Sequence, residues 1–359
     1  MTSSFHRNLS VVLPTYNSIA FLPTAVESIL CQTHTDFELI VVNDGSTDAT
    51  QAYLDEIAGS DPRLKVIKQE NAGIVASLNH GITAANGEFI ARMDADDIAH
   101  PARLAKQVAY LKAHPRIGVI GTQMRVFSQS NNKTKRSRYP THPDKIAMAF
   151  AKGRNPVCHP SVVIRKQVLL DVGGYRSFFT AAQDYDLWLR LQDRTQIANL
   201  SEVLLDYRSH DNSTTVKQHL AQNNCRAIAR YCADKRRQGH PDPLDEMGGV
   251  VDTAKIRNAE TRNELDAILD TLPFYHDVLE DPVKLASATA EHQINVLKLL
   301  EKGYLGGGRK NIALFCERVF FAARQKGNKP LMRAALRLHK SCSTTRHLKF
   351  VMKENAIFL

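Results

Sequence analysis

Three features that mark other classes of protein are missing from this sequence of 359 residues. No stretch approaches the roughly 18 consecutive apolar residues of a membrane-spanning helix, so we expect a soluble protein. The polar start MTSSFHRN runs straight into an apolar strand pattern without the features of a secretory signal, which favours a cytoplasmic location. The six cysteines lie far apart without a CxxC pair, which argues against a disulfide framework and a structural zinc site.

Basic residues are scarce in the first hundred residues and acidic residues are scarce in the last sixty, although the formal net charge is +10. Residues 1–100 contain 5 Lys and Arg against 13 Asp and Glu, whereas residues 301–359 contain 13 against 3. A basic C-terminal region is typical either of a solvated helical face or of a surface for a phosphate-bearing partner. Because its basic residues are not interleaved with aromatic residues, we do not expect nucleic acid as a partner, and an anionic membrane surface remains.

The first hundred residues alternate between short apolar runs and helical patterns, which predicts a mostly parallel sheet flanked by helices. The expected strands are 9–13, 37–42, 64–68 and 88–93, and the expected helices are 19–31, 48–58 and 73–85. In such sheets, ligands bind outside the carboxyl ends of the strands. Those ends carry the polar segments PTYN (14–17), NDGSTD (43–48), QENAG (69–73) and DADD (94–97). We therefore expect all four segments at one edge of the sheet.

The pattern continues beyond residue 100 and then changes to helices alone. The expected elements are a helix at 101–113, a strand pair at 117–128, a mobile basic loop at 128–143, a strand at 160–164, a helix at 181–192 and a strand at 203–208. Five helical patterns follow, at 216–236, 254–270, 283–303, 310–325 and 330–352. The sequence predicts one α/β domain over 1–214, a Rossmann-like mixed sheet, and an all-helical region over 215–359.

The segment DADD offers hard oxygen ligands for a metal ion. In an extended segment, Asp94 and Asp96 point to the same side and Asp97 to the opposite side, where it would have a supporting role. Two convergent carboxylates suit Mg²⁺ or Mn²⁺. One of these residues could instead cap the helix that opens at Pro101, but a cap needs one residue and the segment has three.

Two further motifs at the same edge each have a plain structural alternative. Asp44 could accept hydrogen bonds from a nucleobase, but Asp-Gly is also a turn signal, with Ser46 or Thr47 as the N-cap of the next helix. Tyr16 could stack on a base, or it could be an ordinary packing residue.

The helical segment AAQDYDLWLRL (181–191) separates two acidic residues by environment. Asp186 and Arg190 are four residues apart and predict an ion pair. Asp184 shares an otherwise apolar stripe with Trp188 and Leu191, where a carboxylate without a partner would be costly. Such a residue is a candidate general base.

The last strand ends in YRSH, where alternation puts Asp206, Arg208 and His210 on one face. This face is either a solvated edge or a source of a cation and an imidazole for a phosphate or metal.

The motifs PTYN, NDGSTD, MDADD and QDYDLW, in this order, resemble the family 2 glycosyltransferases of GT-A fold over about residues 8–212. The segments NPVCHPSVVIRK (155–166) and VGGYR (172–176) look like the bacterial branch that builds surface polysaccharide and lipopolysaccharide. The sequence departs from the family pattern at Gln183, where Glu is usual. We interpret that change as altering acceptor contacts or tuning Asp184.

The resemblance implies a nucleotide-binding half at 1–100, an acceptor half at 101–214 and a set of site residues. Tyr16 and Asp44 would hold the nucleobase, Arg208 would approach the phosphates, Asp184 would be the catalytic base, and His159 matches a family position without an assigned role. The implied nucleotide-sugar contacts are Pro14, Thr15, Tyr16, Asn17, Asp44, Asn71, Gly73, Asn79, Arg92, Asp94, Ala95 and Arg208. The implied ligands of Mn²⁺ or Mg²⁺ are Asp94, Asp96 and His210. Of these, Asp94 would contact the ribose or a metal-bound water.

The expected function is inverting, metal-dependent transfer of a sugar from a nucleotide sugar, most often a UDP-sugar, to a hydroxyl of a glycan or lipid-linked acceptor. One alternative is a sugar nucleotidyltransferase, which should show a Gly-rich basic loop that PTYNSIAF lacks. The other is a silent nucleotide-binding scaffold, against which Asp94, Asp96 and Asp184 argue. The basic helices, including the apolar segment IALFCERVFFAARQ (312–325), could pack on the catalytic domain, form a homodimer, or contact an anionic membrane at the inner face of the cell.

Overall fold

The computed structural model describes residues 7–128, 134–209, 219–248, 253–280, 285, 288–302 and 309–342. The chain divides into two compact units, Met1–His219 and Leu220–Leu359, and each is described by itself.

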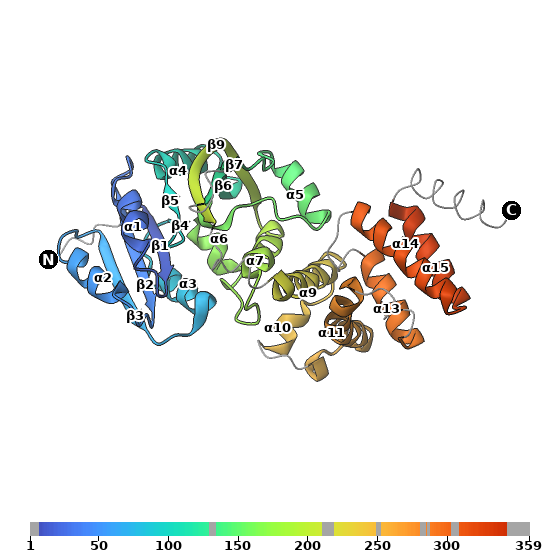
Figure 1. Cartoon of the computed structure of the whole chain (residues 1–359). Coiled ribbons are helices and arrows are strands. Elements are labelled where there is room, and N and C mark those ends of the chain that lie inside the picture. The colour runs from blue at the N-terminus through green and yellow to red at the C-terminus, as the bar shows by residue number, and fades with distance from the viewer. Residues whose placement is uncertain are drawn as a thin grey trace. The chain divides into compact units, whose positions relative to one another are not determined.

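The first unit is built on four parallel strands in the order β3-β2-β1-β4. They are β1 (Leu9–Thr15), β2 (Phe37–Asp44), β3 (Leu64–Gln69) and β4 (Phe89–Arg92), and the connecting helices are α1 (Leu22–Leu30), α2 (Thr50–Ala58) and α3 (Gly73–Ala84). Every residue of β1 is buried, because helices cover both faces of a central parallel strand (Figure 1). Helix α3 packs directly on β1, since a Cβ added to Gly81 would lie 2.5 Å from Cγ1 of Val12.

The sheet continues past β4 with mixed strand directions, in the order β4-β8-β6-β9-β5. Its strands are β5 (Ile98–Ala99), β6 (Ile117–Ser128), β8 (Val163–Arg165) and β9 (Gln196–Ser209), with β7 (Thr134–Arg136) paired to β6. Its helices are α4 (Arg103–Ala113), α5 (Pro143–Ala151), α6 (Lys166–Asp171) and α7 (Gln183–Gln192). The predicted fold class, a mostly parallel mixed sheet flanked by helices, is confirmed.

Several predicted elements differ in extent. The predicted strand pair at 117–128 is wrong, because β6 is one continuous strand that pairs with β9 along most of its length. The predicted basic loop contains β7, whose backbone groups pair with Arg125–Phe127 of β6 and so satisfy that strand's exposed edge. Residues 129–133 of the loop lie outside the described residues. The sequence interpretation also missed α5 and α6 and began β9 too late.

The second unit is helical in its described parts, as predicted. Its elements are α9 (His219–Arg237), α10 (Pro243–Met247), the 3-10 turn Thr253–Lys255, α11 (Ala259–Glu280), α13 (Ala290–Glu301), α14 (Arg309–Gln325) and α15 (Lys329–Cys342) (Figure 1). The predicted helix at 330–352 is described as far as Cys342, and its remainder lies outside the described residues. Among the described helices, none has the length and apolar character needed to cross a membrane.

Candidate active site

The four polar segments after β1, β2, β3 and β4 lie at one edge of the sheet, as predicted. Neighbouring strands in this part of the sheet pair in parallel, so all four carboxyl ends point the same way. The strands end at Thr15, Asp44, Gln69 and Arg92. The site can therefore be assembled from loops that are far apart in sequence.

The segment after β4 brings three carboxylates together. Asp94, Asp96 and Asp97 each offer one oxygen, and these atoms lie within 4.8 Å of one another. The prediction that Asp97 points away was wrong, because β4 ends at Arg92 and the chain turns at Ala95 and Asp96. Strand alternation does not apply in a turn, so all three side chains join one cluster.

The acidic cluster is electrostatically crowded. Asp97 is fully buried; its Oδ1 accepts from the backbone N–H of Arg208 at 2.9 Å, and its Oδ2 has no partner within the described part of the chain. Burial and the charges of Asp94 and Asp96 raise the pKa of Asp97 well above its usual value. Burial raises the pKa of Asp94 too; repulsion from Asp96 and Asp184 adds to this effect and the Arg92 cation opposes it. A buried, unpaired carboxylate oxygen among like charges fits a hard divalent cation.

Two buried arginines stand beside the cluster. Arg92 forms an ion pair with Asp94, while its Nε and Nη1 have no partner among the described residues. Arg103 on α4 donates to the carbonyl oxygen of Arg92 at 2.6 Å and to Gln107 at 3.1 Å. Burial lowers the pKa of Arg103 to about 10. The sequence interpretation missed Arg103, although its place four residues before Gln107 on the buried face of α4 was a readable signal.

The Asp44 carboxylate is held by the start of α3. It accepts from Gln69 Nε2 at 2.7 Å and from the backbone N–H groups of Ala72 and Gly73, each at 2.9 Å. The alternative that Ser46 or Thr47 caps the next helix was wrong, because α2 begins at Thr50. Carboxylate oxygens offer about four acceptor positions, so one stays available to a ligand.

The residues around Asp44 form a connected rim. Tyr16 is 50% exposed, which rejects the alternative that it is a packing residue. Asn17 has a φ of 48°, and its Oδ1 accepts from the N–H of Thr47 at 2.8 Å. Asn71 donates to the carbonyl oxygen of Asp44 at 3.1 Å. Pro14 and Thr15 belong to the end of β1, Gly73 opens α3 and Ala95 lies in the acidic turn.

The two acidic residues of α7 have different surroundings. Asp184 is partly buried, and its Oδ2 accepts from Asn155 Nδ2 at 2.8 Å. Its charge reaches Asp94, whose pKa it helps to raise. Asp186 is 1% exposed and pairs with Arg190 at 2.7 Å, so the predicted ion pair is confirmed. The structure thus brings Asp184 toward the acidic cluster and commits Asp186 to the fold.

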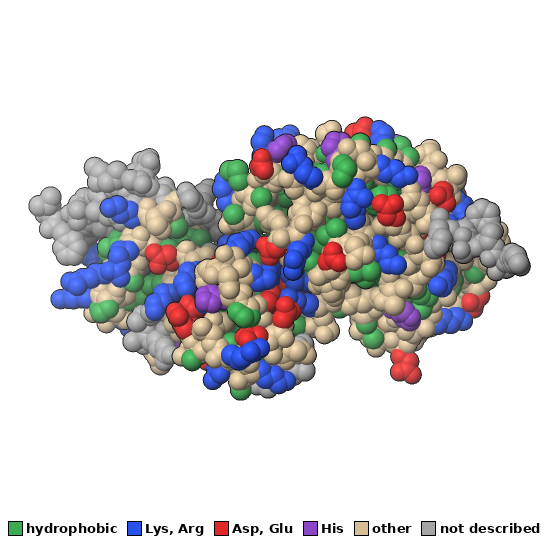
Figure 2. All heavy atoms as spheres, turned by 180° about the vertical axis from the view of Figure 1, so that it is seen from behind, with side chains coloured by type: hydrophobic (Ala, Val, Ile, Leu, Met, Phe, Trp, Pro, Cys, Tyr) green, Lys and Arg blue, Asp and Glu red, His purple; other side chains and the backbone are tan. Residues whose placement is uncertain are grey.

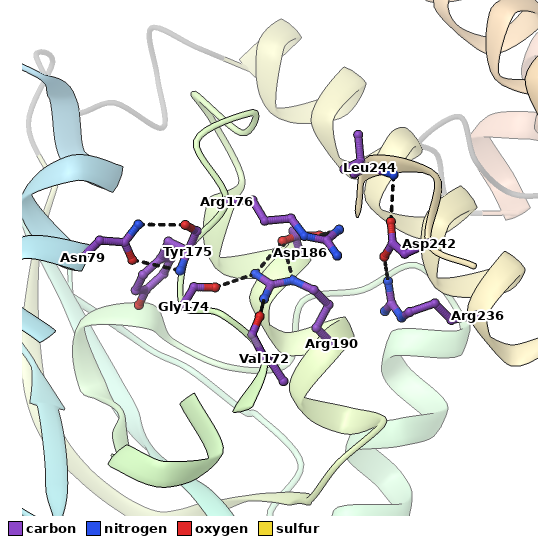
Figure 3. Close-up of polar contacts among 10 residues, drawn as sticks. All are labelled: Asn79, Val172, Gly174, Tyr175, Arg176, Asp186, Arg190, Arg236, Asp242 and Leu244. Atoms are coloured by element: carbon purple, nitrogen blue, oxygen red, sulfur yellow. Dashed lines mark hydrogen bonds and ion pairs between the residues drawn. The ribbon is translucent and has the colours of Figure 1, made fainter. Parts of the chain in front are cut away.

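The segment VGGYR is fastened from two sides (Figure 3). Arg190 donates to the carbonyl oxygens of Val172 at 2.6 Å and of Gly174 at 2.8 Å. On the other side, Asn79 exchanges two hydrogen bonds with the backbone of Tyr175, at 2.8 and 3.0 Å. The family resemblance implied that Asn79 contacts the nucleotide sugar. In the structure, its side-chain amide holds the backbone of Tyr175 instead.

Tyr175 in turn meets the histidine whose role the family resemblance left open. The Tyr175 hydroxyl lies 2.7 Å from Nε2 of His159, and both side chains are buried. Burial, with the nearby Arg92 cation, holds the pKa of His159 well below its usual value. His159 is therefore neutral at neutral pH and acts as a hydrogen-bonding group beside Arg92.

The end of β9 closes the cluster from another side. Arg208 is buried, which rejects the solvated-edge alternative for this residue. Its Nε donates to the carbonyl oxygen of Asp96 at 2.8 Å, and its guanidinium lies 4.8 Å from the ring of Phe21. Asp206 pairs with Arg125 instead. The predicted ligand His210 lies outside the described residues.

The family model described as glycosyl transferase family 2 matches residues 10–173. The O-antigen biosynthesis glycosyltransferase WbnJ of Escherichia coli is 34% identical over 221 residues, which covers 60% of this chain and 85% of that protein. The putative glycosyltransferase EpsE of Bacillus subtilis is 37% identical over 233 residues, which covers 64% of this chain and 82% of that protein. Among solved structures, S. aureus TarS 1-349 in complex with UDP-GlcNAc has a TM-score of 0.54 at 17% identity, with 95% of this chain and 92% of that chain covered.

The mixed, mostly parallel sheet, with acidic side chains after β4 and a further carboxylate on α7, has the GT-A fold. This chain belongs to glycosyltransferase family 2. Family membership rejects the sugar nucleotidyltransferase and the silent scaffold as alternatives.

Proposed function

We propose that the protein transfers a sugar from a UDP-sugar to a hydroxyl of a glycan or lipid-linked acceptor, with inversion and with the help of a divalent cation, in bacterial surface polysaccharide synthesis. The observation that carries the proposal is the cluster of Asp94, Asp96 and Asp97, whose oxygens lie within 4.8 Å of one another after β4. Asp184 on α7 is held by Asn155 at 2.8 Å, and its charge helps to raise the pKa of Asp94. In this proposal the acidic cluster would lie near the leaving diphosphate, and Asp184 would lie near the attacking hydroxyl.

The donor assignment is supported by the rim and by similar proteins. Tyr16 exposes a ring beyond β1, and Asp44 retains an acceptor position beside the N-terminus of α3. The buried N–H groups of Arg92 that have no partner in the described structure suit an anionic ligand. The similar TarS structure contains UDP-GlcNAc, and the name of WbnJ refers to O-antigen biosynthesis.

In the reaction, Asp184 accepts the proton of the acceptor hydroxyl while the hydroxyl oxygen bonds to the anomeric carbon. The bond between that carbon and the diphosphate oxygen breaks, and the electron pair leaves with the nucleoside diphosphate. One displacement from the opposite side inverts the anomeric centre. Asn155 holds the Asp184 carboxylate through its hydrogen bond at 2.8 Å and so fixes the direction of the base.

The acidic cluster fits Mn²⁺ or Mg²⁺, with Asp94, Asp96 and Asp97 as the residues that would hold it. Such an ion would supply positive charge for the departing diphosphate. Arg208 keeps the turn in place through the carbonyl oxygen of Asp96. Replacing Asp96 by Ala should strongly weaken Mn²⁺-dependent donor binding in calorimetry, and equal donor affinity with and without Mn²⁺ in both proteins would remove the metal from the proposal.

The first experiment is a donor screen. The purified protein is incubated with Mn²⁺ and UDP-, GDP- or dTDP-sugars, and release of nucleoside diphosphate by slow hydrolysis is measured. We expect release from one UDP-sugar above the others, and loss of release in Asp96→Ala. Release from a GDP- or dTDP-sugar alone would contradict the uridine assignment and leave the transferase assignment intact.

A further inference from the structure

The outer face of α15 carries positive charge along its length. Arg333, Arg337 and Lys340 are exposed, and their spacing of four and then three residues puts them on one stripe of the helix. On the opposite side, Leu331, Ala335 and Leu338 are buried. The helix therefore directs its apolar side inward and its basic side to solvent.

Helix α14 and the turn that follows extend this charge. Arg318, Lys326 and Lys329 are also exposed. The single acidic residue of 309–342 is Glu317, and its Oε1 lies 3.0 Å from Nε2 of the buried His339. We call the six exposed residues the basic face: Arg318, Lys326, Lys329, Arg333, Arg337 and Lys340. Figure 2 shows Lys and Arg side chains standing out from the C-terminal helices, at the left of that view.

Helix α14 also exposes one aromatic ring. Phe321 is 41% exposed and follows Arg318 by three residues, so the two side chains share the outer side of α14. Nucleic-acid surfaces that stack bases use several rings in series, whereas Phe321 is the one large aromatic side chain exposed in the described parts of these helices. Exposed basic side chains together with an exposed apolar ring are typical of helices that lie on a bilayer surface.

We propose that α14 and α15 dock the protein on an anionic lipid bilayer, with the basic face on the headgroup phosphates and Phe321 at the level of the acyl boundary. The apolar sides of both helices are already buried within the helical unit. Their packing inside this unit and their contact with a membrane therefore involve different sides of the helices. The proposal does not depend on glycosyl transfer.

The expected effect is large enough to measure. Each Lys or Arg near an anionic surface strengthens association about fivefold, so removing three should weaken it about a hundredfold. The attraction should also fall steeply with salt, because it acts over about a Debye length.

The test uses the full-length protein, without any sugar nucleotide, in co-sedimentation with vesicles. One set contains phosphatidylglycerol and phosphatidylcholine in equal parts, and the other contains phosphatidylcholine alone. The triple variant Arg333→Gln, Arg337→Gln, Lys340→Gln is compared with a matched control that loses three exposed charges of the catalytic unit: Lys65→Gln, Lys112→Gln, Lys145→Gln.

We expect the wild-type protein to bind the anionic vesicles alone. The affinity for these vesicles should fall about a hundredfold in the triple variant of α15 and change little in the control. It should fall by a smaller factor in Phe321→Ser. Equal binding to both vesicle types, or equal losses in variant and control, would overturn the proposal. So would wild-type protein that ignores anionic vesicles but binds an RNA oligomer or self-associates through this face. If circular dichroism shows that the triple variant is unfolded, the lipid and salt dependence of the wild type decides.

Discussion

The two aspartates of α7 offer a matched pair of substitutions with opposite expected results. In Asp184→Asn, the amide oxygen can still accept from Asn155, so the fold and donor binding should change little. The lost function is proton transfer from the acceptor, which a positioned base accelerates by about 10² to 10⁴. We expect kcat to fall by that factor, equivalent to about 3 to 5 kcal/mol in the activation barrier.

In Asp186→Asn, the damage should appear in stability. Its carboxylate is 1% exposed and pairs with Arg190 at 2.7 Å and with Arg176 at 3.5 Å. Removing one partner leaves a buried cation uncompensated, which costs about 3 to 5 kcal/mol. Because Arg190 also holds the backbone of Val172 and Gly174, this segment should loosen as well.

The assay measures product formation with the donor found in the screen, donor affinity by calorimetry, and unfolding by urea. The only tryptophan, Trp188, is buried on the same helix and reports unfolding of the catalytic unit. An Asp184→Asn protein whose kcat stays within threefold of the wild type would refute the base assignment. An Asp186→Asn protein of unchanged stability would refute the electrostatic reasoning for the pair.

Three further predictions concern buried acceptors and charges. Asp97→Asn removes one of three crowded charges, so it should raise the melting temperature without metal yet weaken Mn²⁺ binding at least about tenfold; calorimetry that shows unchanged binding would exclude Asp97 as a ligand. The depressed pKa of His159 means that the unfolded chain binds more protons than the folded chain below about pH 6.5. Stability should therefore fall as the pH drops from about 7.5 to about 5.5, and His159→Gln should reduce that fall in urea titrations followed by Trp188 fluorescence, whereas an unchanged pH dependence would argue against this role. Asp44→Asn cannot accept all three hydrogen bonds that the carboxylate receives, so it should cost about 1 to 3 kcal/mol of unfolding free energy even without nucleotide, and an unchanged urea midpoint would argue against this role.

Much of the fold and part of the site followed from local spacing. Alternation of strands and helices predicted the parallel sheet, and parallel strands necessarily present their carboxyl ends at one edge. The Asp186–Arg190 pair followed from the four-residue spacing on a helix, which fixes the relative direction of two side chains. These relations hold inside a regular element or between strands of known direction.

Tertiary structure decided what lies between elements. Asp97 joins the acidic cluster because the chain turns after β4, whereas spacing along an extended strand predicted the opposite. Asp44 receives the N-terminus of α3, and Arg103 reaches from α4 to the end of β4, contacts between residues well separated in sequence. Such contacts depend on how helices pack on the sheet, which no local pattern of residues specifies. The sequence by itself therefore determined which chemical groups reach this edge. The packing of α3 and α4 on the sheet, and the pairing of β9 within it, decided how those groups contact one another.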